Sequence, residues 1–259
     1  MIVASRALNL LRLSLYYRRT CFDAGLKAAG FNVVQTLHDP KPGDVLLIWN
    51  RYAGFNELAA YFERSGAKVL VTENGHLGKD WKGGEWFSLA LGHHAGAGQW
   101  ADGGPARWDS WGVELKPWQD GPRTHLILGQ RGIGEPGIAS PDHWAETVQR
   151  RIGGRIRKHP GVEKESVSLA DDLAGTGNLV TWNSGAALKA LMLGVAVWYD
   201  FPQWIGAEAA RPLSEWGAEP KRDDAARLSM FQRMAWAMWT LNEIRTGEPI
   251  ERLLASTRL

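Results

Sequence analysis

The chain has 259 residues, of which 44% are hydrophobic and 22% charged, so its composition is that of a globular protein and not of a disordered one. A net charge of +2 excludes a histone-like polycation but allows a local basic groove. The single cysteine excludes a disulfide framework and a cysteine-based zinc site. No run of 18 apolar residues occurs, so we expect no membrane span.

The N-terminal residues do not resemble a targeting signal. Arg6 and Arg12 interrupt the apolar residues, and no small-residue cleavage site follows. We therefore expect a cytoplasmic protein. The 14 tryptophans outnumber the five tyrosines and seven phenylalanines together. Such an excess is typical either of a core short of other large residues or of flat platforms for sugars and bases.

The first part of the chain predicts a β-α-β unit. In chain order we expect a helix over 17–29, strands over 31–36 and 45–49, a helix over 55–65 and a strand over 68–71. Residues 75–121 are rich in glycine, tryptophan and histidine and have little periodicity. A loop region of this length is usually functional or crosses between domains, and we expect some short strands within it.

The second part predicts strands that alternate with helices. The strands are 125–128, 155–157, 179–182 and 195–199, and the helices are 140–152, with Ser140 as N-cap and Pro141 in the first turn, then 168–174, 185–193 and 224–245. Alternation of this kind indicates an α/β protein with parallel sheets covered on both faces. We predict domains over 1–121 and 122–223, with 224–259 a C-terminal helix that packs back across both.

Polar residues follow the predicted strands, at the edge where open α/β sheets bind ligands. The sharpest example is Asn183-Ser184-Gly185, where a strand passes directly into a helix. The free N–H groups and positive end of a helix suit a phosphate or diphosphate. The alternative is a plain N-cap serine followed by a packing glycine.

Two further strand ends carry basic residues. His159 closes a basic strand, and Pro160 restricts it to an extended conformation that directs its side chain. An imidazole there would stabilise a departing phosphate, although the pattern taken alone favours a solvated surface histidine on a basic strand. Gln130-Arg131-Gly132 follows the neighbouring strand, in a glycine-rich segment without dinucleotide or Walker spacing.

Glu73 is the leading candidate for a general base, because it is a carboxylate at the end of an apolar strand. The alternatives are Asp80, His76, His93 and His94, and Arg51 could instead pair with Glu73 in a structural role. The adjacent His93 and His94 have no third ligand at a recognisable spacing, so we expect no metal site.

The chain resembles GT-B glycosyltransferases, whose fold is two Rossmann-type parallel-sheet domains that face a central cleft. The likeness rests on HPG at 159–161, TWNSG at 181–185 and the helix and strand that follow. It is most similar to capsular-polysaccharide and sialyltransferase-type enzymes. TENGHLG at 72–78, GHHAGAG at 92–98 and GQRGIG at 129–134 also resemble small glycosyltransferases of tailed phages, some of which modify viral DNA.

The resemblance implies roles for these residues. Asn183, Ser184, Gly185 and Ala186 would hold the phosphate of a nucleotide-sugar donor, UDP-linked or else CMP-linked. His159 and Pro160 would assist the leaving phosphate, and Gln130, Arg131 and Gly132 would line the donor site. Glu73, or His76 or His94, would deprotonate the acceptor hydroxyl. The absence of a DxD triplet implies transfer without an obligatory metal.

The acceptor stays open between two classes. One is a 5-hydroxymethylpyrimidine base, such as hydroxymethylcytosine, in double-stranded phage DNA, which would place the protein in the host cytoplasm. Its phosphates would contact a groove formed by 76–121 with Arg6, Arg12, Arg18, Arg19 and Arg51. The other is a surface or capsular glycan stacked on tryptophans. A non-catalytic nucleotide-binding module is the third interpretation, and we expect a monomer in each case.

Overall fold

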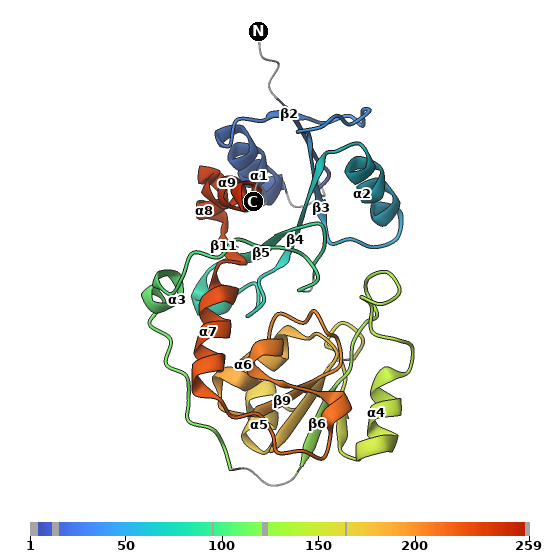
Figure 1. Cartoon of the computed structure of the whole chain (residues 1–259), viewed down its shortest axis with the longest axis vertical. Coiled ribbons are helices and arrows are strands. Elements are labelled where there is room, and N and C mark those ends of the chain that lie inside the picture. Colours follow the sequence, from blue (N-terminus) through green and yellow to red (C-terminus); the bar gives the residue numbers. More distant parts are fainter. Residues whose placement is uncertain (1–4, 12–15, 95, 121–123, 164, 257–259) are drawn as a thin grey trace. The chain divides into compact units, whose positions relative to one another are not determined.

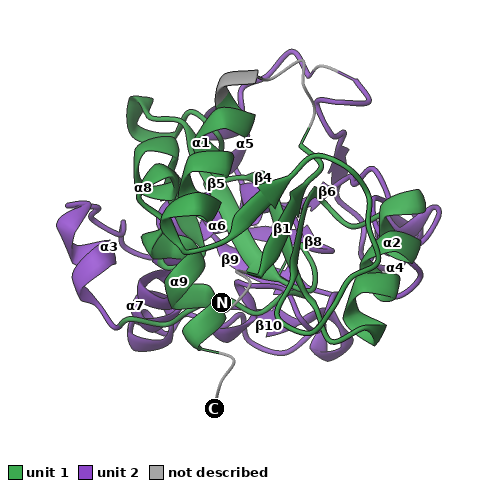
Figure 2. Cartoon of the chain, turned by 90° about the horizontal axis from the view of Figure 1, so that it is seen from above, with its two compact units in different colours: residues 1–103, 236–259 green, residues 104–235 purple. Residues whose placement is uncertain are grey.

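The chain folds into two compact units (Figures 1 and 2). The computed structural model describes residues 5–11, 16–94, 96–120, 124–163 and 165–256. Unit 1 comprises 1–103 and 236–259, and unit 2 comprises 104–235. The boundary therefore differs from the one expected at 121/122, and the segment 224–259 is divided between the units instead of forming one C-terminal helix.

Unit 1 is built on a sheet that has, among the described residues, six strands in the order β11-β5-β4-β3-β1-β2. β1 to β4 are parallel to one another, β5 is antiparallel to β4, and β11 is antiparallel to β5. The strands are β1 (Arg6–Asn9), β2 (Asn32–Val34), β3 (Val45–Trp49), β4 (Lys68–Asn74), β5 (Trp86–Leu91) and β11 (Met238–Thr240). The sequence did not predict β1, because only Ala7 and Leu8 lie between its polar ends.

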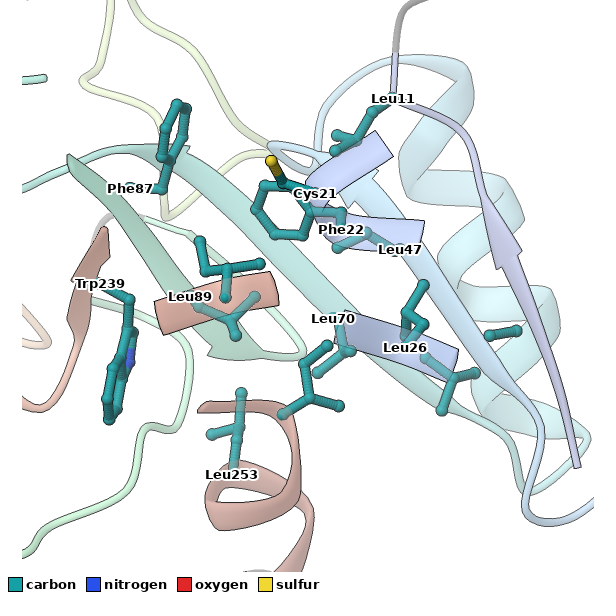
Figure 3. Packing of buried hydrophobic residues seen from close by; sticks show 14 of the residues in the cluster. Leu11, Cys21, Phe22, Leu26, Leu47, Leu70, Phe87, Leu89, Trp239 and Leu253 are labelled. Carbon is teal, nitrogen blue, oxygen red and sulfur yellow. The ribbon is translucent and has the colours of Figure 1, made fainter. Parts of the chain in front are cut away.

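Helices cover both faces of this sheet (Figure 1). They are α1 (Tyr16–Ala28), α2 (Gly54–Arg64), α8 (Leu241–Thr246) and α9 (Glu248–Ala255), together with the short η2 (Trp81–Gly83). Figure 3 shows the main core, in which Phe22 and Leu26 of α1, Leu70 and Phe87 of the sheet and Leu253 of α9 are fully or almost fully buried. On the other face α2 buries Ala59 and Phe62. Removing one such phenylalanine typically costs about 3–5 kcal/mol of stability.

The predicted helix over 224–245 is wrong in its second half. It is divided into α7 (Asp224–Ala235), the strand β11 and α8. Met238 pairs with Ser88 on β5, so the sheet satisfies the backbone at this point. Thr240 then forms a capping box with Glu243 and starts a new helix. Sheet pairing and the cap thus override the helical spacing of the apolar residues.

Unit 2 is a second α/β layer with a sheet of five parallel strands, among the described residues, in the order β10-β9-β8-β6-β7. The strands are β6 (His125–Leu128), β7 (Arg155–Arg157), β8 (Asn178–Thr181), β9 (Ala196–Tyr199) and β10 (Arg211–Pro212). The α-helices besides α7 are α3 (Ala106–Ser110), α4 (Trp144–Ile152), α5 (Leu169–Ala174) and α6 (Gly185–Met192). Two short 3₁₀ helices, η3 (Ala207–Ala209) and η4 (Leu213–Glu215), complete the unit's described helices. α4 packs on the face that carries Ile127, Val180 and Trp198, and α6 contacts β8 and β9.

The expected α/β class with two parallel-dominated, Rossmann-like sheets is confirmed. Local boundaries differ in places. His143, with φ 55°, is the N-cap of α4, so the start predicted at Ser140 is wrong. The reason is a turn in which the Trp144 N–H donates to the Pro141 carbonyl at 3.1 Å. The irregular region 75–121 contains β5 and α3, and no helix in the described ranges is long and apolar enough to cross a bilayer.

In both sheets the strand order reverses at the first strand of the parallel part, because the next two strands in the chain lie on opposite sides of it. In unit 2, β7 lies on one side of β6 and β8 on the other; in unit 1, β2 and β3 flank β1 in the same way. Such a switch point leaves an opening at the carboxyl ends of the two diverging strands, and open α/β proteins bind ligands there. The candidate sites are therefore the ends of β6 and β8 in unit 2 and of β1 and β3 in unit 1.

Candidate functional site

The sequence-predicted donor residues of unit 2 lie together at this switch point. Gln130 and Arg131 directly follow β6, and Asn183 and Ser184 directly follow β8. His159 follows β7, the other neighbour of β6. Because the three strands are parallel and adjacent, their carboxyl ends share one edge of the sheet. Residues that are far apart in the sequence thus form one cluster.

Ser184 caps helix α6. Its Oγ accepts a hydrogen bond from the Ala186 N–H at 3.2 Å, and its own N–H donates to Thr181 Oγ1 at 2.9 Å. Ser184 is therefore the N-cap of α6, as the alternative interpretation of the sequence predicts. Ser184, Gly185 and Ala186 remain partly exposed, so protein does not cover the helix start. The first N–H groups of a helix lack intrahelical acceptors and suit an anion.

His159 is held in one tautomer. The Gly161 N–H donates to His159 Nδ1 at 2.9 Å, so the neutral ring carries its proton on Nε2. Partial burial, assisted by the nearby Arg131 charge, lowers the pKa of His159 below its ordinary value. The imidazole is thus neutral at pH 7 and presents Nε2–H as a donor. Gly161 permits this packing, because a Cβ there would lie 3.1 Å from His159 Nδ1 and 3.2 Å from Arg131 Cδ.

The basic strand beside His159 is largely neutralised. Arg155 and Arg157 both pair with Asp172 on α5, and Lys158 pairs with Glu163. Arg131, by contrast, has no ion-pair partner among the described residues. It is therefore the guanidinium that can respond to an arriving anion.

Gln130 supplies a second unsatisfied group at the same edge. Its Nε2 is buried and makes no hydrogen bond within the described part of the chain. A buried donor without a partner costs about 1–3 kcal/mol, so a ligand that accepts from it gains that interaction. Gln130, Arg131 and the Nε2–H of His159 together form a set of donors that suits a phosphate.

Aromatic residues brace this edge, and sequence reasoning did not assign them this role. Trp182, in the TWNSG segment, donates from Nε1 to the Ile138 carbonyl at 2.8 Å and stacks on Phe201 with ring centroids 5.7 Å apart. Trp144 donates to Asp200 Oδ2 at 2.7 Å. These contacts tie the glycine-rich segment after β6 to the ends of β8 and β9. The density of tryptophan beside strand ends was the available signal.

In unit 1, Glu73 lies inside β4 and not in a loop. The strand extends to Asn74, three residues beyond the predicted end, and Glu73 pairs with Ser88 on β5. Alternation along the strand places Glu73 on the α2 face, in line with the buried Val71. The residue is partly exposed near the carboxyl end of the strand.

Two of the alternative bases differ in environment. Burial lowers the pKa of His76 to about 4, although part of the residue reaches solvent, which limits the shift. His94 is buried, accepts the Arg51 N–H on Nδ1 at 3.0 Å and stacks on His93 with centroids 4.4 Å apart. His94 thus acts here as a positioning residue for Arg51.

The arginines expected to contact DNA are already engaged. Arg51 forms a two-pronged pair with Glu63, at 2.8 and 2.9 Å, so the expected alternative of an Arg51–Glu73 pair is wrong. Arg6 pairs with Asp44 at 2.6 Å, and Arg18 lies 3.8 Å from Glu85. Arg19 donates to the Leu11 carbonyl, and Arg12 lies outside the described residues. Within the described ranges no three His, Cys, Asp or Glu residues form a metal-binding group.

Comparisons with known proteins yield a fold likeness. No family model matches the chain, and no curated protein matches its sequence. Two similar solved structures come from Thermosulfurimonas dismutans KpsC. Its beta Kdo 2,7 transferase has a TM-score of 0.57 and 14% identity, covering 98% of this chain and 100% of that one. Its beta Kdo 2,4 transferase has the same score and identity, with coverages of 94% and 99%. The chain therefore shares its fold with these transferases over nearly its whole length.

Proposed function

We propose that the protein is a GT-B glycosyltransferase that moves a sugar from a nucleotide-sugar donor to a hydroxyl of a glycan. The observation that carries this proposal is the cluster of unsatisfied donors at the switch point of unit 2. Both similar structures are named as Kdo transferases, which supports an acidic sugar as the group transferred. A surface or capsular glycan is favoured over phage DNA, because Arg6, Arg18 and Arg51 already pair with carboxylates.

In the proposed reaction the donor phosphate binds at the start of α6, where Ser184, Gly185 and Ala186 are accessible, beside the side chain of Asn183. Arg131 supplies a compensating charge, and His159 donates from Nε2 to a phosphate oxygen. As the bond from the sugar to the phosphate breaks, negative charge grows on that oxygen and both interactions strengthen. Fixed donors of this kind make transfer without an obligatory metal chemically reasonable.

Glu73 is our proposed general base, which requires unit 1 to present it to the acceptor hydroxyl. Burial lowers the pKa of His76 to about 4, which leaves its imidazole no more basic than an ordinary carboxylate. His94 uses Nδ1 to accept from the Arg51 backbone. Glu73 would take the hydroxyl proton while the acceptor oxygen bonds to the sugar and the nucleotide leaves with the bonding electrons.

The test is a panel of UDP-, GDP-, dTDP- and CMP-linked sugars, including CMP-Kdo, assayed for nucleotide release and for transfer to glycan or hydroxymethylcytosine-containing DNA. We expect release from at least one donor. Glu73→Gln should retain donor binding but lose about 100-fold or more in transfer rate, the usual contribution of a general base. Glu251→Gln, an exposed carboxylate of α9, is the control. A chain that binds no donor, or full transfer by Glu73→Gln, would contradict the proposal.

A further inference from the structure

Two aromatic side chains are exposed where β3 passes into α2. Tyr52 is 49% exposed and Phe55 is 36% exposed. They follow the carboxyl end of β3. The neighbouring strand, β4, carries Glu73. Neither Tyr52 nor Phe55 belongs to either core cluster of unit 1. Their place at a ligand-binding edge calls for a functional explanation.

Phe55 belongs to the inward stripe of its helix. Phe55, Ala59 and Phe62 lie at positions i, i+4 and i+7, and the last two are completely buried against the sheet. Phe55 is in the first turn of α2, which begins at the carboxyl edge of the sheet. Side chains of a helix lean toward its N-terminus, so Phe55 lies over the strand ends and not over the outer surface.

A strained turn holds both rings in place. Ala53 has φ 51° and ψ −138°, the conformation of the first central residue of a type II′ turn, which favours glycine. Asn50 also has a positive φ, of 43°. The Phe55 N–H donates to the Tyr52 carbonyl at 3.3 Å, so the two aromatic residues are the first and fourth residues of this turn. Strain of this kind costs on the order of 1–3 kcal/mol and persists only where neighbouring contacts enforce it.

Arg51 provides those contacts. Besides its pair with Glu63, its Nε donates to Asn56 at 2.9 Å and its guanidinium donates to the Gly92 carbonyl at 2.7 Å. His94 accepts its backbone N–H at 3.0 Å. The side chain and the backbone of one residue thus fix the start of the turn on two sides. These contacts fix the loop in a conformation that leaves Tyr52 and Phe55 exposed to solvent.

We propose that Tyr52 and Phe55 form a stacking surface for a sugar ring of the acceptor glycan, an inference that rests on the proposed glycosyltransferase function. Flat aromatic faces pack against the C–H faces of pyranose rings, and rigid rings lose little entropy on binding. Charge favours a sugar over a nucleic acid: Glu63 engages the guanidinium of Arg51, and Glu57 adds a carboxylate to the first turn of α2. This loop therefore offers no unpaired cation to a phosphate backbone.

Saturation-transfer NMR on the full chain tests the surface directly. The probes are the methyl glycosides of Kdo, galactose and N-acetylglucosamine, and a short duplex DNA. We expect transfer to the ring protons of at least one glycoside, with affinity reduced about five-fold or more in Phe55→Ala and in Tyr52→Ala. Phe55→Trp should restore binding because it keeps a flat face. Tyr61→Ala is the matched control, since Tyr61 is 38% exposed on another side of the same helix.

The outcomes separate this inference from the proposed function. Glycoside binding that is unchanged in both Phe55→Ala and Tyr52→Ala overturns the stacking surface, whatever the donor assay shows. Phe55-dependent binding of the duplex DNA, with no glycoside bound, overturns it in favour of a nucleic acid. Wild-type protein that binds a glycoside through Phe55 but releases nucleotide from no donor would instead contradict the proposed function. Thermal unfolding of each variant verifies that it is folded.

Discussion

At the scale of single residues, the sequence predicts which polar residues lie at the strand ends. Gln130, His159 and Ser184 each follow a strand of the parallel sheet, and adjacent parallel strands bring such residues to one edge. Which cation remains available could not be predicted. The sequence does not show that Arg155 and Arg157 are paired while Arg131 is not; only the position of Asp172 on α5 shows that the first two are neutralised. Pairing of this kind depends on tertiary contacts that have no local pattern.

The buried His76 leads to a prediction about pH and stability. Its pKa is about 4 in the folded chain, against an ordinary value of 6.5. Between these values the unfolded chain binds a proton that the folded chain does not, so stability falls as pH drops from 6.5 toward 4. The full shift corresponds to about 3 kcal/mol, and because the residue is partly exposed we expect a loss of about 1–2 kcal/mol. Urea unfolding at pH 7.5 and 4.5 measures the loss.

Replacing His76 isolates its contribution. Glutamine does not titrate, so His76→Gln should lose less stability than the wild type over the same pH interval. His143→Gln, at an exposed position, should behave as the wild type does. Equal losses in wild type and His76→Gln would show that this imidazole is not the group responsible.

At the scale of elements, periodicity predicted the strands and helices where local and tertiary preferences agree. It failed over 236–246, where pairing of β11 with β5 replaced helical hydrogen bonds. It did not predict that Phe55, which shares a stripe with the buried Ala59 and Phe62, stays 36% exposed at the start of α2.

The start of α6 allows its capping role to be separated from its proposed anion-binding role. Ser184→Ala removes the cap and should cost about 1 kcal/mol of stability. Ser184→Asp keeps a cap, because aspartate caps helices as well as serine does, but it places a negative charge beside the proposed phosphate. We therefore expect near-wild-type stability and at least about ten-fold weaker nucleotide binding, measured by calorimetry with CMP and UDP.

Ser168 is a matched control for this pair. It caps α5 through a hydrogen bond from the Asp171 N–H at 3.1 Å, in the same unit. Ser168→Ala should lower stability by a similar amount and leave nucleotide affinity unchanged. Unaltered affinity in Ser184→Asp would mean that the α6 start only caps its helix.

At the scale of the whole molecule, the sequence predicts two α/β layers but not how the chain is shared between them. The return of 236–259 to unit 1 depends on the contact between β11 and β5, which are far apart in the sequence. Gly103-Gly104-Pro105 is a turn signal at the first boundary, but no comparable pattern marks position 236. The glycine-rich region suggested a later one, because it was interpreted as a single irregular segment.

This division predicts that donor binding belongs to unit 2 alone. Residues 104–235 are continuous in the chain, have their own core and contain Gln130, Arg131, His159 and Ser184. Expressed alone, this segment should unfold cooperatively and bind CMP or UDP within about three-fold of the full chain, since both proteins offer the same donors. Arg131→Ala should weaken binding equally in the segment and in the full chain. A folded segment that binds no nucleotide, while the full chain binds it, would place essential donor contacts in unit 1.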